Sequence, residues 1–232
     1  MTAEEQALLA AVEARFAVLG AGTPPWDDPH PGAESPAEEE YSRLLDPAKY
    51  RILAARARAW TEVLVAARLA RVEEVAEPAV LACHPTTPLE RSWWLRPVRA
   101  GALPLLVGLR SMDGVTETVA ELWVAEPPVL VTVVPDCGCD ACDEGSAGYL
   151  TELDEHVLHV VRGGFVRVEL PGGSHATSDP NGCSASGFSI PDDYVAEVER
   201  ARAGTSPYPS TSGRSWFAPD GPEAAVVTPA TA

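Results

Sequence analysis

Three cysteines within six residues are the most distinctive chemical feature of this sequence. Cys137, Cys139 and Cys142 lie in a short segment that also contains Gly138 and several aspartates. The C-x-x-C spacing lets two sulfurs converge, and a glycine permits a tight turn, so the three thiols can supply three corners of a tetrahedral zinc site. Zinc is therefore the candidate cofactor, with Cys137, Cys139 and Cys142 as its ligands.

The fourth ligand of such a site is not evident from the sequence. A structural zinc site normally has four protein ligands, and no second C-x-x-C or H-x₃₋₅-H pair follows the loop. The opposing interpretation is that the thiols bind no metal and pack as small apolar side chains. If zinc does bind, the fourth ligand can come from a distant residue or from a neighbouring carboxylate: Cys83, His84, His175, Cys183, Asp140 or Asp143.

An enzyme that uses the cysteine loop for thiol or metal-dependent chemistry is the alternative hypothesis. Cys142 precedes a predicted helix, and a helix N-terminus lowers the pKa of a nearby thiol. Asp136, Asp140, Asp143 and Glu144 lie beside the thiols, however, and their negative charge disfavours a thiolate. The chain also contains no dinucleotide-binding glycine motif, P-loop, serine nucleophile elbow or zinc-protease motif. We therefore favour a non-enzymatic binding or interaction module over an enzyme.

A second candidate site combines tryptophan with arginine. Trp93 and Trp94 lie between Arg91 and Arg96, and Arg99 follows. On a strand, adjacent side chains face opposite sides, so we expect one indole to enter the core and the other to face outward among the arginines. Trp and Arg are enriched at the energetic centres of protein interfaces. We predict a surface for a protein partner here, unless the proline-rich segment or the C-terminal tail covers the outward indole.

The overall charge narrows the classes of partner. The 232-residue chain has 34 acidic and 17 basic residues, for a net charge of −17. This field repels nucleic acids, so we predict no nucleic-acid partner. No apolar run reaches the roughly 18 residues of a membrane helix, and Glu4 and Glu5 occupy positions where a secretory signal is basic. We expect a cytoplasmic protein without membrane contact, whose five cysteines are not in structural disulfides.

The apolar pattern predicts an α+β fold. Met112-Asp113-Gly114 has the composition of a hairpin turn between two strands. Consecutive strands with short links favour an antiparallel sheet of about four to six strands, packed against a long central helix and a second helix. Helical spacing covers residues 2–19, 46–67 and 146–162, and strand patterns cover residues 93–98, 103–110, 115–124, 129–134 and 165–170.

The chain is predicted to divide into four segments. Residues 1–22 form an amphipathic helix, residues 23–45 a proline-rich acidic segment with Trp26 as its anchor, residues 46–203 one α+β domain, and residues 204–232 a flexible tail. Within the domain, residues 171–187 are rich in Gly, Ser, Asn and Asp and are predicted to be a long loop. His159 points away from the apolar face of its helix, so we expect it to be partly solvated.

Several of these segments together resemble a known family. They are the Glu-Glu-Glu-Tyr-Ser-Arg stretch at residues 38–43, the start of the central helix at residues 46–51, the cysteine loop, and Gly-Gly-Phe-Val at residues 163–166. Over about residues 20–200 the chain is similar to uncharacterised proteins of high-GC Gram-positive bacteria, which share a domain of unknown function. The resemblance implies a soluble bacterial protein and transfers no activity and no catalytic residue.

Overall fold

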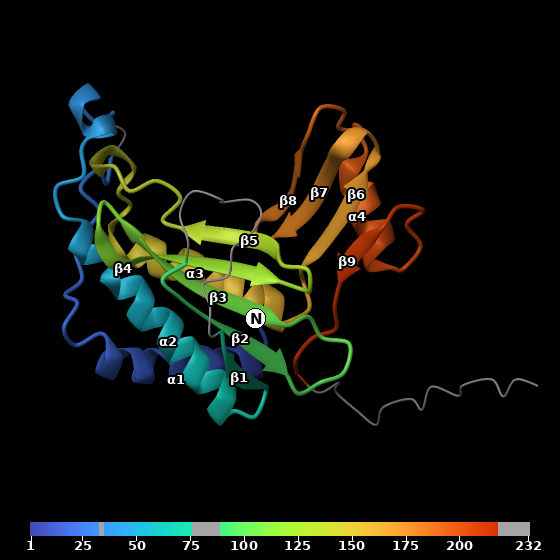
Figure 1. The fold of residues 1–232 in the computed structure, drawn as a ribbon, viewed down its shortest axis with the longest axis horizontal. Coiled ribbons are helices and arrows are strands. Elements are labelled where there is room, and N and C mark those ends of the chain that lie inside the picture. Colours follow the sequence, from blue (N-terminus) through green and yellow to red (C-terminus); the bar gives the residue numbers. More distant parts are fainter. Residues whose placement is uncertain (33–34, 76–88, 218–232) are drawn as a thin grey trace, which may run out of the picture.

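The structure is a computed structural model that describes residues 1–32, 35–75 and 89–217. Cys83 and His84, two of the predicted distant ligands, lie outside these residues. The chain has the predicted α+β fold (Figure 1). The α-helices of the described residues are α1 (Ala3–Leu19), α2 (Arg51–Ala66), α3 (Gly145–Val161) and α4 (Tyr194–Arg202). None of the helices within these ranges is both long and apolar enough to span a membrane.

The first sheet is an antiparallel meander with strand order β1-β2-β3-β4-β5; β2 to β5 correspond to predicted strands, whereas β1 was not predicted and the strand predicted at residues 165–170 belongs to the second sheet. Asp113 and Gly114 both have positive φ, of 50° and 75°, as the hairpin turn between β3 and β4 requires. One face of this sheet packs on α2 and α3, and α1 packs against α2 on the same side (Figure 1). Its strands are β1 (Ala70–Glu74), β2 (Arg91–Pro97), β3 (Leu105–Met112), β4 (Val115–Val124) and β5 (Val129–Val134).

Helix α2 is the centre of the main core, as its apolar spacing predicts. Trp60 on this helix is 1% exposed, and its Nε1–H donates a hydrogen bond of 2.6 Å to Asp154 on α3. The same carboxylate accepts two hydrogen bonds from Arg56, at 2.9 and 2.6 Å. A buried guanidinium without its partner is costly, so this pair fixes how α2 and α3 pack together.

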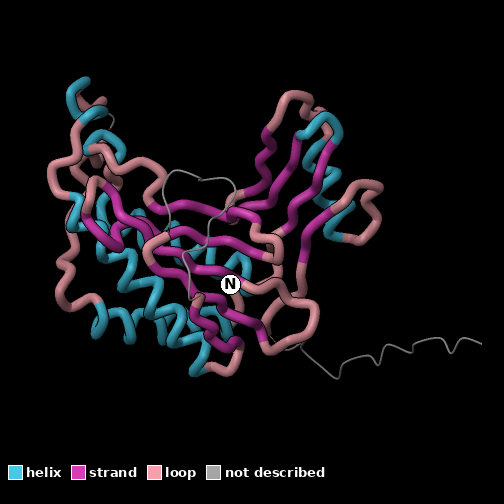
Figure 2. The backbone as a smooth tube through the Cα atoms, viewed as in Figure 1, coloured by secondary structure: helices cyan, strands magenta, loops and turns pink. Residues whose placement is uncertain are grey.

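A second sheet was not predicted. The segment 171–187, expected to be a loop, contains the hairpin of β7 (Ser174–Asp179) and β8 (Gly182–Ser186). The strand order is β8-β7-β6-β9, with β6 at Val166–Leu170 and β9 at Ser210–Ser212, and the two sheets form separate groups of strands (Figure 2). The side chains of β7 that pack against α4 are small, so the strand lacks the strong apolar alternation that identifies a strand.

Residues 204–217 also differ from the flexible tail that we expected. Strand β9 pairs with β6, and Trp216 is 2% exposed in the main core. The Trp216 backbone N–H donates to the Val161 carbonyl at 2.7 Å, and its indole donates to the Leu103 carbonyl at 3.1 Å. This part of the chain therefore closes the junction between the two sheets.

His159 is buried, at 7% exposure. The expectation that it is partly solvated was therefore wrong. The Ser178 hydroxyl donates to the Gly164 carbonyl and accepts from the Val166 N–H, so His159 Nε2 is the donor in its 3.2 Å contact with that hydroxyl. Burial, followed by the nearby charge of Arg162, lowers the pKa of His159 to about 4. The reason for the difference is local: near the C-terminal end of α3, Ser178 of β7 and Gly164 lie against the His159 ring.

Candidate metal centre

The three cysteines converge on the loop that links β5 to α3. This loop contains the short 3₁₀ helix η3 (Asp140–Cys142). The Sγ atoms of Cys137, Cys139 and Cys142 all lie within 4.8 Å of one another, and the Cys137 and Cys139 sulfurs are 3.3 Å apart. Tetrahedral zinc with Zn–S bonds of about 2.3 Å places its sulfur ligands ~3.8 Å apart. The predicted triad therefore fits one zinc ion after movements of an ångström or less.

Asp140 anchors the loop to the segment before the central helix. Its carboxylate accepts hydrogen bonds from Arg43 Nε at 2.7 Å and from the Leu45 backbone N–H at 3.1 Å, and its own N–H donates to the Arg43 carbonyl. The hydrogen bond from Arg43 lowers the pKa of Asp140. Both carboxylate oxygens are thus engaged, so Asp140 serves as an anchor in preference to a fourth ligand.

Asp143 anchors the other end of the loop. This carboxylate is buried and accepts hydrogen bonds of 2.9 Å from Trp26 Nε1 and from the Gly145 N–H. It also forms an ion pair with Lys49. Like Asp140, it is committed to contacts inside the protein, and it is not available to a metal without losing them.

An aromatic cluster holds the proline-rich segment against the loop. The rings of Trp26, Tyr50 and Tyr149 lie edge to face or tilted, with centroids 5.4 to 6.4 Å apart. Lys49 Nζ lies 5.2 Å from the centroids of both Trp26 and Tyr50. The Tyr149 hydroxyl donates to the Cys142 carbonyl at 2.7 Å. Trp26 is therefore the anchor that its position in the segment predicted, and the cluster fixes the backbone of a candidate ligand.

Gly138 packs closely against a side chain of the first sheet. A Cβ atom at this position would lie 2.0 Å from the Met112 sulfur at the end of β3. Met112 thus presses directly on the residue between Cys137 and Cys139. The sequence predicted that a glycine permits a tight turn here, but Gly138 does not have a positive φ, and the contact with Met112 is the reason for glycine that the structure gives.

The distant candidates His175 and Cys183 belong to the second sheet, on β7 and β8. His175 lies in a cleft with Val129, at the start of β5, whereas the cysteine loop follows the end of β5. Five residue steps along a strand cover about 16 Å. Among the described residues, only the three cysteines form a cluster of metal-ligand atoms, and it includes neither His175 nor Cys183.

Hydrogen bonds among the thiols shift the pKa values of Cys139 and Cys142 in opposite directions. The hydrogen bond with Cys139, followed by burial, raises the pKa of Cys142 to about 12. Burial acts to raise the pKa of Cys139, but hydrogen bonds from Cys137 and Cys142 outweigh it and lower that pKa. Cys142 also ends η3, and α3 begins three residues later, at Gly145. The hypothesis that a helix dipole activates Cys142 as a nucleophile is therefore disfavoured.

With this geometry established, comparison with known proteins shows the family. A model described as a family of unknown function (DUF6226) matches residues 12–220. The chain belongs to this family. No curated protein and no solved structure matches the chain. The matched residues include the cysteine loop. The family description assigns no activity to it.

The structure places the predicted tryptophan and arginine site differently from our expectation. Trp93 and Trp94 are only 4% and 8% exposed, so neither indole faces outward. Trp93 lies in the main core and donates to the Thr61 hydroxyl of α2 at 2.8 Å. Trp94, on the opposite face of β2, packs with Leu89, Leu106 and Trp123. The reason is that β2 lies between β1 and β3 and has apolar neighbours on both faces.

The arginines of this site are paired. Arg96 lies 4.6 Å from the centroid of Trp94 and forms ion pairs with Glu73 and Glu126. Arg91 lies 3.6 Å from Glu117. Arg99 donates to the Ser215 carbonyl at 3.0 Å. That Arg91, Arg96, Trp93 and Trp94 bind a protein partner stays a prediction, with the arginines as its accessible part.

Proposed function

We propose that this protein is a non-enzymatic binding module whose cysteine loop holds one structural zinc ion. The observation that carries the proposal is the convergence of three sulfurs on a loop that is anchored at both ends. Cys137, Cys139 and Cys142 bind zinc as thiolates, since the metal itself displaces their protons. The exposed acidic residues Asp136 and Glu144 raise the local concentration of cations.

The structural role follows from what the loop connects. Asp140 ties it to Arg43, Asp143 ties it to Trp26, and Tyr149 of α3 holds the Cys142 carbonyl. A zinc ion bound here stabilises the contact between the proline-rich segment, the end of β5 and α3. We place the module in the cytoplasm, where thiols stay reduced, with a protein partner and no nucleic-acid or membrane partner. The net charge of −17 supports the exclusion of nucleic acid.

A second candidate is a metal-dependent enzyme. The observation that favours it is that the described residues supply three ligands, and a catalytic zinc site keeps its fourth position open. The identity of the fourth ligand separates the two functions. Cys83→Ser or His84→Ala lowers zinc affinity if the site is structural and closed by one of them, and neither has an effect if the position is open.

The test of zinc binding is elemental analysis of protein purified without chelator and without a metal-affinity tag. We expect about one zinc per chain. Cys139→Ser lowers both the zinc content and the melting temperature, while the matched control Cys183→Ser changes neither. Well under half an equivalent of zinc, together with an unchanged melting temperature after addition of a strong chelator, would refute the proposal.

A further inference from the structure

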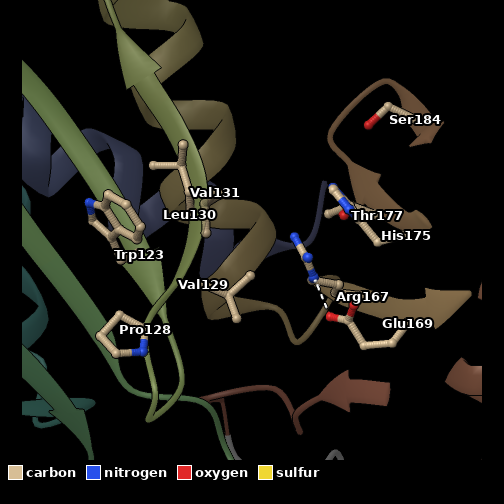
Figure 3. A pocket seen from close by; sticks show the side chains of 10 residues that line it. All are labelled: Trp123, Pro128, Val129, Leu130, Val131, Arg167, Glu169, His175, Thr177 and Ser184. Atoms are coloured by element: carbon tan, nitrogen blue, oxygen red, sulfur yellow. Dashed lines mark hydrogen bonds and ion pairs between the residues drawn. The ribbon is translucent and has the colours of Figure 1, made fainter. Parts of the chain in front are cut away.

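A cleft of about 640 Å³ separates the edge of the first sheet from the second sheet (Figure 3). Its volume falls within the roughly 300–1,000 Å³ of small-molecule sites. The wall on the side of the first sheet is apolar. β5 is the last strand of that sheet, and the residues of this wall are Trp123, Pro128, Val129, Leu130 and Val131.

The opposite wall is polar because the second sheet has two different faces. Val166, Val168 and Ala176 face α4 and form a small core with it. The residues that alternate with them along the strands face the cleft, as period-two geometry requires. These are Arg167, Glu169, His175, Thr177 and Ser184.

Arg167 supplies the positive charge in the lining of this cleft. Its Nε donates to Glu169 at 2.7 Å, and its guanidinium extends from β6 toward the β5 wall (Figure 3). Within the described parts of the chain, no hydrogen bond engages its two terminal nitrogens. The Arg167 side chain is 23% exposed and that of Glu169 is 52% exposed, so Arg167 is the less hydrated of the two charges. Coulomb interactions strengthen as water is excluded.

His175 adds a neutral polar group to this wall. Burial, followed by the charge of Arg167, lowers the pKa of His175. The imidazole is therefore uncharged at neutral pH and can exchange a hydrogen bond with a ligand without adding a second cation. Arg167 remains the cation of the polar wall.

We propose that the cleft binds a small amphipathic monocarboxylate, with its carboxylate on the terminal nitrogens of Arg167 and its apolar body against β5. The planar guanidinium matches a carboxylate with two parallel hydrogen bonds. A phosphate dianion is a poorer fit, because it doubles the repulsion from Glu169 and from an overall charge of −17. The inference rests on the binding-module part of the proposed function and does not depend on zinc.

The experiment is calorimetric titration of the full-length protein with hexanoate, octanoate and decanoate, and with octylammonium as the cationic probe. We expect saturable binding of one carboxylate per chain, about fourfold tighter for each added methylene that the apolar wall buries. Octylammonium does not compete. Arg167→Gln weakens octanoate binding about tenfold or more, whereas Glu169→Gln leaves it unchanged or tightens it, because the guanidinium is then free of its partner. Arg71→Gln, an exposed arginine on β1, is the control and has no effect.

Circular dichroism confirms that each variant is folded before titration. Absence of octanoate and decanoate binding to the wild-type protein overturns the inference, as does equal binding to wild-type and folded Arg167→Gln protein. Tighter binding of octylammonium, lost in Glu169→Gln, reverses the predicted charge and also overturns it. Zinc content is measured on the same samples, so failure of the carboxylate site and failure of the zinc site are separate results.

Discussion

The cysteine loop and strand β2 present their reactive or interactive side chains in opposite ways. The loop holds three thiols at or near the surface, while two of its carboxylates, those of Asp140 and Asp143, anchor it to the rest of the protein. Strand β2 holds both indoles inside, and its arginines are paired with glutamates. Proximity within six residues follows from the local chain, whereas the exposure of a strand depends on the segments that cover each face. Local spacing is therefore the more dependable guide to a site.

The largest effect is expected from strand β2. Trp93→Ala removes a buried indole and its hydrogen bond to Thr61, so we expect the free energy of unfolding to fall by about 3–5 kcal/mol. Denaturant unfolding measures it. A loss below about 0.5 kcal/mol is typical of surface positions, and it would show that Trp93 belongs to an exposed contact surface after all.

The buried His159 on α3 is expected to make the stability of the protein depend on pH. Its pKa of about 4 in the folded protein is below the ordinary value of 6.5, so the unfolded state takes up a proton first as the pH falls. The stability that neutral His159 allows is therefore present above about pH 6.5 and is lost between pH 6.5 and 4, by at most about 3 kcal/mol. Unfolding measured across this range should show a shallower loss for His159→Gln than for wild type. Parallel curves for the two proteins would mean that His159 is solvated.

Gly138→Ala tests how tightly the cysteine loop is held. The added methyl group collides with the flexible end of the Met112 side chain, which has to move, so we expect a loss of about 1 kcal/mol in stability, at the low end for overpacking, and a lower zinc content. Gly22→Ala is the control, since a Cβ there meets no atom within 4 Å. Unchanged stability and zinc content in Gly138→Ala would indicate a loop that moves freely away from β3.

Arg96→Gln is expected to have the smallest effect. Its partners Glu73 and Glu126 are largely exposed, and such ion pairs contribute at most about 1 kcal/mol. Thermal unfolding measures this loss. A decrease of several kcal/mol would show that Arg96 holds Trp94 in place and does more than pair with surface acids.

Much of the first sheet could be predicted from the sequence. β4 and β5 have the predicted bounds because their apolar, β-branched runs end at an Asp-Gly turn and at prolines. Strands β7 and β8 could not be predicted, because the buried residues of β7, Ser174, Ala176 and Ser178, are small and weakly apolar. The burial of Trp216 depends on Val161 and Leu103, which are distant in sequence.

Only part of the candidate metal centre could be predicted from the sequence. The closeness of the three sulfurs follows from their spacing, so the sequence predicted it. The contacts that anchor the loop could not be predicted from the spacing, because Arg43 is 97 residues from Asp140 and Trp26 is 117 residues from Asp143. The acidic character of the loop suggested metal ligands, but two of those acids hold the loop in place.

X-ray absorption at the zinc edge of the purified protein tests the central claim most directly, because it counts the sulfur atoms bound to the metal. With zinc held by Cys137, Cys139 and Cys142, the fit requires at least three sulfurs at about 2.3 Å, and the fourth scatterer distinguishes a further sulfur from nitrogen or oxygen. In Cys139→Ser the sulfur count falls by one or the zinc is lost. A shell of nitrogen and oxygen alone, or a wild-type spectrum identical to that of Cys139→Ser, would contradict the account.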